Sequence, residues 1–219
     1  MASRTRYDAK GIQVEAEPGS RGRVLRNLLG IRRVADVKQA ESQALLLAQA
    51  EAIQRYGDDQ RFTAADICDL HRLWLGPVYA WAGEIRTVNV GKGGFQFAHA
   101  PLIQGLMAEM ERGALNQFTP CVSAADAHIA HALAVVHAEL ILIHPFRDGN
   151  GRVARLLAVL MGLQAGLPPL NFSALDGRHH AAYIVGIHAA VARNYAPLAA
   201  VFERVISRTW KQYEASNAQ

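Results

Sequence analysis

The sequence has few cysteines, no long apolar run and no dense cluster of charge of one sign. Its two cysteines, Cys68 and Cys121, are too few for a disulfide framework and lie too far apart in the chain to form a metal-binding pair. Disulfides are rare in reducing compartments. This cysteine usage therefore favours a reducing compartment, and we expect a cytoplasmic protein.

Membrane segments are also missing from the sequence pattern. A spanning helix needs about 18 or more consecutive apolar residues, and the nearest candidate, residues 153–170, is interrupted by Arg155, Gln164 and Gly166. The first residues are basic, but no apolar run follows them, as a secretory signal would require. We therefore expect neither a secretory signal nor a membrane span.

The overall composition is that of a globular protein. Apolar residues make up 51% and charged residues 19% of the chain, which excludes a disordered polypeptide. The 23 Lys and Arg residues exceed the 19 Asp and Glu residues by a net charge of only +4. Because the basic residues are dispersed, we expect no direct binding of nucleic acid. A length of 219 residues predicts one domain, since a domain averages about 150 residues.

Turn signals and apolar periodicity divide the chain. Residues 1–23 are polar and contain the turn Pro18–Ser20, so we expect a flexible or loosely packed leader. Residues 24–208 form the expected domain and residues 209–219 a polar tail. The predicted helices cover residues 34–56 (with Asp36 as N-cap), 63–75, 101–117, 123–143, 151–164, 178–193 and 197–213.

A change of pattern between the second and third helices predicts a β-hairpin. Residues 83–90 and 95–97 alternate apolar and polar side chains, and the glycine-rich segment Gly91–Gly94 separates them. We therefore predict a mostly α fold, a helical bundle around a central helix–loop–helix motif with one small β-hairpin.

The stretch from His144 to Arg155, His-Pro-Phe-Arg-Asp-Gly-Asn-Gly-Arg-Val-Ala-Arg, carries the most chemistry. One helix is expected to end at its start, and the segment Gly149–Gly151 opens the next. Free N–H groups at a helix N-terminus bind anions, and glycine allows a ligand to come close. Arg152 and Arg155 share one face of this helix, where the positive helix end disfavours them unless a polyanion binds.

Asp148 and His144 extend this anion site. A carboxylate beside an anion repels it unless a divalent cation lies between them, and proteins bind Mg²⁺ through one or two carboxylates together with substrate phosphates. His144 supplies a group that titrates near neutral pH and can act as a general base. The combination predicts group transfer from a nucleoside triphosphate bound with Mg²⁺.

Three other patterns are weaker. The segment Gly91–Gly94 is close to a P-loop, but Lys92 is not followed by the Ser or Thr that would bind the metal. The segment Gly149–Ala154 matches a loose dinucleotide fingerprint, but no alternation of strands and helices surrounds it. His128 and His131 are spaced as a metal pair without a third ligand, so we favour solvated or packed histidines.

Residues 144–155 fill every position of the pattern His-Pro-Phe-x-Asp-Gly-Asn-Gly-Arg-x-x-Arg, and they resemble the signature of the Fic family (filamentation induced by cyclic AMP). Trp81–Thr87 and the glycine-rich hairpin resemble the target-binding flap of that family. Leu28–Ile31 and Tyr195–Leu198 resemble positions common in its bacterial members. The resemblance covers roughly residues 24–206 and implies the Fic fold.

The resemblance implies a role for each residue of the loop. His144 is expected to be the general base that takes a proton from a target hydroxyl, and Phe146 to anchor the loop in the core. Asp148 is expected to hold Mg²⁺ across the α- and β-phosphates of ATP.

The phosphate-binding and target-binding residues are implied in the same way. Gly149, Asn150 and Gly151 are expected to form the anion hole for ATP, Arg152 to bind the outer phosphates and Arg155 to reach the γ-phosphate. The flap is expected to align a target segment by adding a strand to it. Its residues are Val90, Gly91, Lys92, Gly93, Gly94 and Phe95.

The implied reaction is AMPylation, catalysed by a protein adenylyltransferase that uses ATP. A phosphorylating branch of the family, similar to the Doc toxin, carries Lys where this sequence has Gly151. AMP transfer is therefore favoured over a Doc-like protein kinase. A degenerate Fic-like module that binds nucleotide or a partner without turnover is the other alternative, although such a module has no need of His144.

Regulation is inferred from a missing pattern. Many Fic proteins resemble one another in a silencing helix with Ser/Thr-x-x-x-Glu-Gly/Asn, whose Glu pairs with the second arginine of the motif. No Ser or Thr in this sequence has Glu four residues later. The resemblance therefore implies a separate small antitoxin that bears this helix, with this chain as the toxin of the pair. The short bacterial toxins of the family suggest type II topoisomerase subunits as target proteins.

Overall fold

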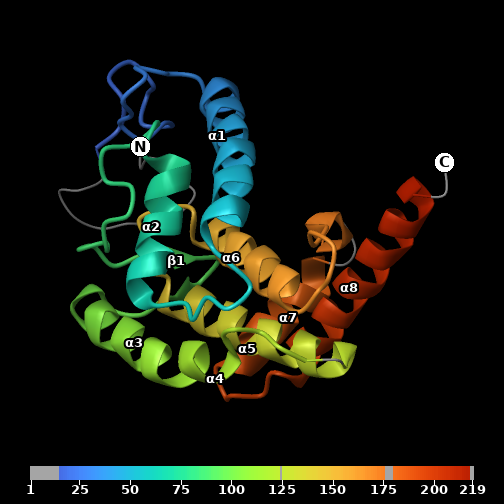
Figure 1. Cartoon of the computed structure of the whole chain (residues 1–219). Helices are drawn as coiled ribbons and strands as arrows, with labels where there is room; N and C mark the ends of the chain where they lie inside the picture. The colour runs from blue at the N-terminus through green and yellow to red at the C-terminus, as the bar shows by residue number, and fades with distance from the viewer. Residues whose placement is uncertain (1–14, 124, 176–179, 218–219) are drawn as a thin grey trace. The chain divides into compact units, whose positions relative to one another are not determined.

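A computed structural model describes residues 15–123, 125–175 and 180–217. The described chain divides into two compact units, and Figure 1 traces the path of the chain through them. The first unit contains residues 15–55, 64–107 and 143–150, and the second contains residues 56–63, 108–142 and 151–217, apart from the gaps given above. The structure is mostly helical with one two-stranded antiparallel sheet, as the sequence predicts.

The first unit is built on two packed helices, α1 (Val34–Arg55) and α2 (Ala64–Leu75). Two aromatic side chains are anchored by Glu41 of α1. The Trp74 Nε1–H donates a hydrogen bond to the Glu41 carbonyl oxygen at 2.8 Å, and the Tyr79 hydroxyl donates to its carboxylate at 2.7 Å. These bonds satisfy the polar ends of buried aromatic rings. The surrounding apolar core contains Val24, Val37, Ala48, Trp74, Leu75, Val78, Tyr79 and Ala82.

The described part of the predicted leader is packed against this core. Ala16 and Leu25 form an isolated antiparallel bridge, and the Ser20 hydroxyl bonds to the Val24 backbone at 3.4 Å. Ser20 and Val24 are both buried. Residues 15–23 therefore form a turn packed against this core, while residues 1–14 of the predicted leader lie outside the described residues.

The hairpin is shorter than the sequence predicts. Its strands are β1 (Gly91–Lys92) and β2 (Phe95–Gln96), which pair in antiparallel register. Gly93 and Gly94 form the two-residue turn with φ values of +58° and +83°, a conformation that glycine adopts without strain. Residues 83–90 form no strand, because the Arg86 backbone N–H donates to the Pro145 carbonyl oxygen at 2.8 Å instead of to a second strand.

The second unit is helical. Helices α7 (His180–Ala190) and α8 (Ala196–Asn217) pack against each other, and the short 3₁₀ helix η3 (Phe172–Leu175) contacts α8. The remaining helical elements of the described chain are η1 (Ala100–Leu102), α3 (Ile103–Met110), the π-helical turn η2 (Glu111–Leu115), α4 (Asn116–Phe118), α5 (Asp126–Ile143) and α6 (Asn150–Gln164). Three of them, α3, α5 and α6, contain residues of both units.

The helices lie close to their predicted positions, with three differences. Helix α1 begins at Val34, so Asp36 lies within its first turn and is not the N-cap. The helix predicted over residues 101–117 is divided into shorter elements by the π-helical turn. Helix α8 continues to Asn217, so the predicted boundary after residue 208 falls inside a helix.

Helix α5 is long and apolar enough to cross a membrane by length and composition alone. In the structure, 67% of this 18-residue segment is buried inside the protein. Such burial is typical of the central helix of a globular domain.

The interior of the second unit contains a neutral histidine. The His137 side chain is buried and lies 3.0 Å from the Tyr183 hydroxyl, measured from Nε2. Burial, together with the positive charge of Arg155, lowers the pKa of His137 to about 3. His137 is thus a packed core residue.

This histidine makes stability depend on pH. The unfolded chain protonates His137 near pH 6.5 and the folded chain only near pH 3, so the stabilisation is complete above pH 6.5 and declines on acidification. The decline contributed by this one group approaches about 1.4 kcal/mol per pH unit. We expect the free energy of unfolding, measured with urea between pH 7 and 4.5, to fall less steeply in His137→Gln. The exposed His128→Gln is the control, and equal slopes for His137→Gln and the parent would contradict the prediction.

Candidate active site

The loop that carries the predicted chemistry begins with a strained residue. Helix α5 ends at Ile143, and His144 follows with a φ of +53°, a left-handed conformation that is uncommon outside glycine. Pro145 cannot continue the helix because it lacks an N–H group. His144 is also buried, at 4% exposed. The sequence therefore places the candidate general base where the backbone must be held by its surroundings.

Arg86 holds this backbone. Its Nε donates to the His144 carbonyl oxygen at 2.7 Å, its Nη1 to that of Val88 at 2.6 Å and its Nη2 to that of Ala98 at 2.6 Å. The side chain is buried, and no carboxylate among the described residues forms an ion pair with it. Burial lowers the pKa of Arg86 to about 10, so it stays charged at neutral pH. Its charge serves to bind carbonyl oxygens that connect the loop to the hairpin.

A second contact joins the hairpin to His144. The Phe97 ring stacks on the imidazole with 3.6 Å between centroids and 13° between planes. Phe97 directly follows β2, and its backbone N–H donates to the Val90 carbonyl oxygen at 3.2 Å. Val90 is buried against Val88. The predicted flap and the predicted base are thus parts of one packed arrangement in the first unit.

His71 of α2 supports the loop through a second set of contacts. Its ring stacks on Phe146 with 3.8 Å between centroids. Its Nδ1 accepts a hydrogen bond from the Gly83 N–H at 2.8 Å, so Nε2 carries the proton and donates to the Asp148 carbonyl oxygen at 3.0 Å. Phe146 is fully buried, as the family resemblance implies.

The Asn150 side chain joins the end of the loop to its middle through two hydrogen bonds to Phe146. Its side-chain oxygen accepts from the Phe146 N–H and its side-chain N–H donates to the Phe146 carbonyl oxygen, both at 2.8 Å. Asn150 is 0% exposed. Its side chain is therefore structural, and a contribution to an anion hole is left to its backbone N–H.

Asp148 fits the metal-binding role predicted for it. It is only partly buried, and one carboxylate oxygen accepts a hydrogen bond from the Gly149 N–H at 2.5 Å. Among residues 15–123, 125–175 and 180–217, no three His, Cys, Asp or Glu side chains converge as a metal site. A single carboxylate completed by phosphate oxygens is a normal environment for Mg²⁺.

The two motif glycines have different reasons to be glycine. Gly149 has a φ of +85°, and a Cβ there would lie 2.7 Å from Trp74 Cζ3. Gly151 has ordinary backbone geometry, and a Cβ there would have no neighbour closer than Arg155 Nη2 at 4.0 Å. Protein packing explains the first glycine, while the open space at the second fits the close approach of a ligand.

The two motif arginines lie at the start of α6, which begins at Asn150. Arg155 is fixed by a hydrogen bond from its Nε to the Gly151 carbonyl oxygen at 3.1 Å. Its charge also acts on the buried Tyr183, whose pKa burial raises to about 12. Arg152 and Arg155 thus place positive charge at a positive helix end, an unfavourable arrangement that a bound anion relieves.

Sequence reasoning missed Arg86 and His71 as parts of the site. Arg86 lies 58 positions and His71 77 positions from the loop residue that each one contacts. The sequence offered one sign of their role: Arg86 and His71 are polar residues that stand among apolar neighbours in the chain. Trp81, in the segment that resembles the flap, stacks on Tyr79 with 4.6 Å between ring centroids.

Comparison with known proteins agrees with this architecture. Residues 61–161 match the model of the Fic/DOC family. The protein adenylyltransferase Fic of Nematostella vectensis is 32% identical over 146 residues, which are 65% of this chain and 32% of the relative. The protein adenylyltransferase VbhT of Bartonella schoenbuchensis is 29% identical over 144 residues, 65% of this chain and 30% of the relative. The chain therefore spans about a third of the length of these relatives.

Solved structures show the same fold. BepC, a VirB-translocated effector of Bartonella tribocorum determined with bound AMPPNP, has a TM-score of 0.70 at 22% identity and covers 87% of this chain and 94% of its own. The type IV secretion system effector BepA has a TM-score of 0.70 at 20% identity and covers 92% of this chain and 72% of its own.

Fold and site together define a helical domain that presents a glycine-containing anion-binding loop at the start of a helix, directly after a buried histidine. The family match across this loop gives the domain its name. The chain is a member of the Fic family and carries a Fic/DOC domain.

The two glycines give a matched test. Gly149→Ala should lower the free energy of unfolding by about 1–3 kcal/mol because alanine is strained at this φ. Gly151→Ala should leave stability unchanged or raise it by up to about 1 kcal/mol, since alanine favours helices, but weaken ATP binding. Chemical unfolding and calorimetric titration with ATP measure the two effects. Equal stability of the two variants would contradict the conclusion that only Gly149 is required by the backbone and its packing.

Arg86 gives a second test. Arg86→Met should lower the free energy of unfolding by about 2–4 kcal/mol because several buried carbonyl oxygens lose a charged donor. Arg86→Lys should recover only part of this stability, since an ammonium cannot reproduce the planar guanidinium geometry. Urea unfolding of the parent and the two variants measures the order of their stabilities. An Arg86→Met protein as stable as the parent would show that the hydrogen bonds of Arg86 contribute nothing to stability.

Proposed function

We propose that this domain is a protein adenylyltransferase, which transfers AMP from ATP to a hydroxyl side chain of a target protein. The observation that carries the proposal is the packing of His144 against the hairpin by Arg86 and Phe97. It couples a histidine base to a hairpin whose tip is exposed, in a chain that retains the complete motif. Relatives named protein adenylyltransferase support the same reaction.

The proposed reaction is one displacement at phosphorus. The target hydroxyl oxygen forms a bond to the α-phosphorus of ATP while the bond from that phosphorus to the oxygen bridging to the β-phosphate breaks. Pyrophosphate leaves, and the hydroxyl proton passes to the imidazole of His144. Phe97 and the left-handed backbone hold the ring in one orientation, so the base is in place before a target binds.

The phosphates are assigned to the loop and the start of α6. The backbone around Gly151 has room for close approach, and Arg152 and Arg155 supply positive charge for the outer phosphates. Asp148 would hold Mg²⁺, which neutralises phosphate charge when it is bound. These groups stabilise the negative charge of the leaving pyrophosphate.

The target segment is assigned to the hairpin. Lys92, Gly93 and Gly94 are exposed at its tip, so the proposal places the target segment along an edge of this two-stranded hairpin. An extended target segment can add to such an edge without regard to its side chains. The residue modified would then be the one whose hydroxyl group comes within hydrogen-bonding distance of His144.

The cellular setting follows from the sequence interpretation. We propose a cytoplasmic toxin whose activity is restrained by a small antitoxin with the silencing helix, and type II topoisomerase subunits as candidate targets. Relatives that are bacterial effectors or animal proteins show that the fold also serves other settings.

Paired isotope labels test the reaction. The purified chain with α-³²P-ATP, Mg²⁺ and a bacterial lysate should label a target protein, and γ-³²P-ATP should not. His144→Ala should reduce labelling by at least about 100-fold, the usual contribution of a general base, while exposed His128→Ala retains it. Label from γ-³²P-ATP alone would establish a kinase. ATP binding without label from either nucleotide, in the presence of a competent lysate, would favour a binding module.

A further inference from the structure

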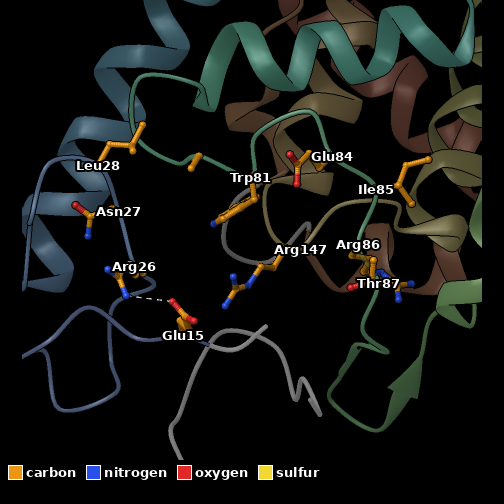
Figure 2. Close-up of a pocket in the computed structure, with 11 residues that line it drawn as sticks. Glu15, Arg26, Asn27, Leu28, Trp81, Glu84, Ile85, Arg86, Thr87 and Arg147 are labelled. Carbon is orange, nitrogen blue, oxygen red and sulfur yellow. Dashed lines mark hydrogen bonds and ion pairs between the residues drawn. The ribbon is translucent and has the colours of Figure 1, made fainter. Parts of the chain in front are cut away.

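A pocket lies beside the loop, within the first unit. It has a volume of about 550 Å³ and is lined by residues of the N-terminal turn, the segment Ala80–Thr87 and Arg147. Figure 2 shows the Arg147 guanidinium beside the Trp81 ring, with Arg26 and Asn27 facing them from the N-terminal segment. Arg147 occupies the variable position of the motif, between Phe146 and Asp148, so the pocket contacts the loop at a residue that the proposed reaction does not use.

Two hydrogen-bond donors in this pocket have no acceptor. Arg147 Nη2 and Trp81 Nε1 are both buried atoms without a hydrogen-bond partner in the described chain. No carboxylate among the described residues lies within ion-pair distance of Arg147. The guanidinium carbon lies 5.8 Å from the centre of the Trp81 ring, which fixes the two donors near one another. Buried donors without an acceptor are costly, so the pocket is organised to receive an oxygen acceptor.

The charge of the lining selects the kind of acceptor. Arg26 is already paired with Glu15 at 3.3 Å, and Arg86 is occupied by carbonyl oxygens. The lining carries Arg26, Arg86 and Arg147 against Glu15 and Glu84, so it has one positive charge in excess. A single negative charge balances it, whereas a phosphate dianion would be repelled by the two glutamates. Burial lowers the pKa of Arg147, which shows that its charge is incompletely solvated.

We propose that this pocket binds the carboxylate of an acidic side chain from a polypeptide, which Arg147 receives as a forked donor and Trp81 as a single donor. A guanidinium binds a carboxylate through two parallel hydrogen bonds. The site differs from the positions assigned to ATP, Mg²⁺ and the hairpin-bound target segment. Its occupant would contact the loop that carries His144 and Asp148, and would thereby bind more tightly when that loop is formed.

Nuclear magnetic resonance of the tryptophan indoles tests the site directly. The chain has three tryptophans, and Trp81→Phe assigns the relevant ¹⁵N–¹H signal. N-acetylglutamate amide should shift the Trp81 signal saturably with a dissociation constant in the millimolar range, as expected for a single side chain. N-acetylglutamine amide should not shift it. The Trp74 indole, which donates to Glu41, is an internal control that should stay in place.

Variants connect the signal to Arg147. Arg147→Gln should weaken binding of the capped glutamate by at least about tenfold, and Arg147→Lys should weaken it less because charge is kept without the fork. Exposed Arg33→Gln is the control and should bind as the parent does. Thermal unfolding confirms that each variant is folded. An unchanged affinity in both Arg147 variants, equal shifts with the glutamine compound, or tighter binding of inorganic phosphate than of the capped glutamate would overturn the proposal.

The carboxylate can come from the same chain or from a partner. The described structure begins at residue 15, and Asp8 is the one acidic residue before it. If Asp8 occupies the pocket, Asp8→Asn should bind the capped glutamate at least about tenfold more tightly than the parent. If a partner supplies the carboxylate, the two should bind equally. Both results support the pocket as a carboxylate site, and the absence of a Trp81 shift in both proteins would refute it.

Discussion

The left-handed turn at His144 is the constraint on which the site depends. A non-glycine residue in this conformation costs about 1–3 kcal/mol and persists only when its surroundings determine it. Here the surroundings hold the turn through two hydrogen bonds to the backbone and one ring contact. Arg86 binds the His144 carbonyl oxygen, its own backbone N–H binds Pro145, and Phe97 covers the imidazole. The base is therefore held by a rigid framework, and catalysis does not have to supply the energy of ordering it.

Apart from His144, the buried polar side chains of this site bind the backbone, whereas partly exposed ones are left for ligands. Arg86, His71 and Asn150 are buried and bind backbone groups. Their hydrogen bonds satisfy loop atoms that would otherwise be buried without partners. Asp148 and Arg147 of the same loop are only partly buried. The loop thus separates its structural residues from those that can meet phosphate, metal or another polypeptide.

Much of the fold could be read from local patterns. The helix predicted over residues 34–56 is observed as Val34–Arg55, and that over residues 151–164 as Asn150–Gln164, because a buried helix face repeats along the sequence. The strand predicted over residues 83–90 was wrong for a nonlocal reason. The alternation there reflects burial of Arg86 and Val88, and the Arg86 N–H is bonded to Pro145.

The sequence by itself determined the inventory of reactive groups, since His144, Asp148, Gly151 and the two arginines follow one another at fixed spacing around a helix start. Only the tertiary structure decided which polar residues are structural. It assigned the Asn150 side chain to Phe146 and added Arg86 and His71, which contact the loop across 58 and 77 positions. Contacts over such separations depend on how helices and loops pack, and no local pattern of residues encodes them.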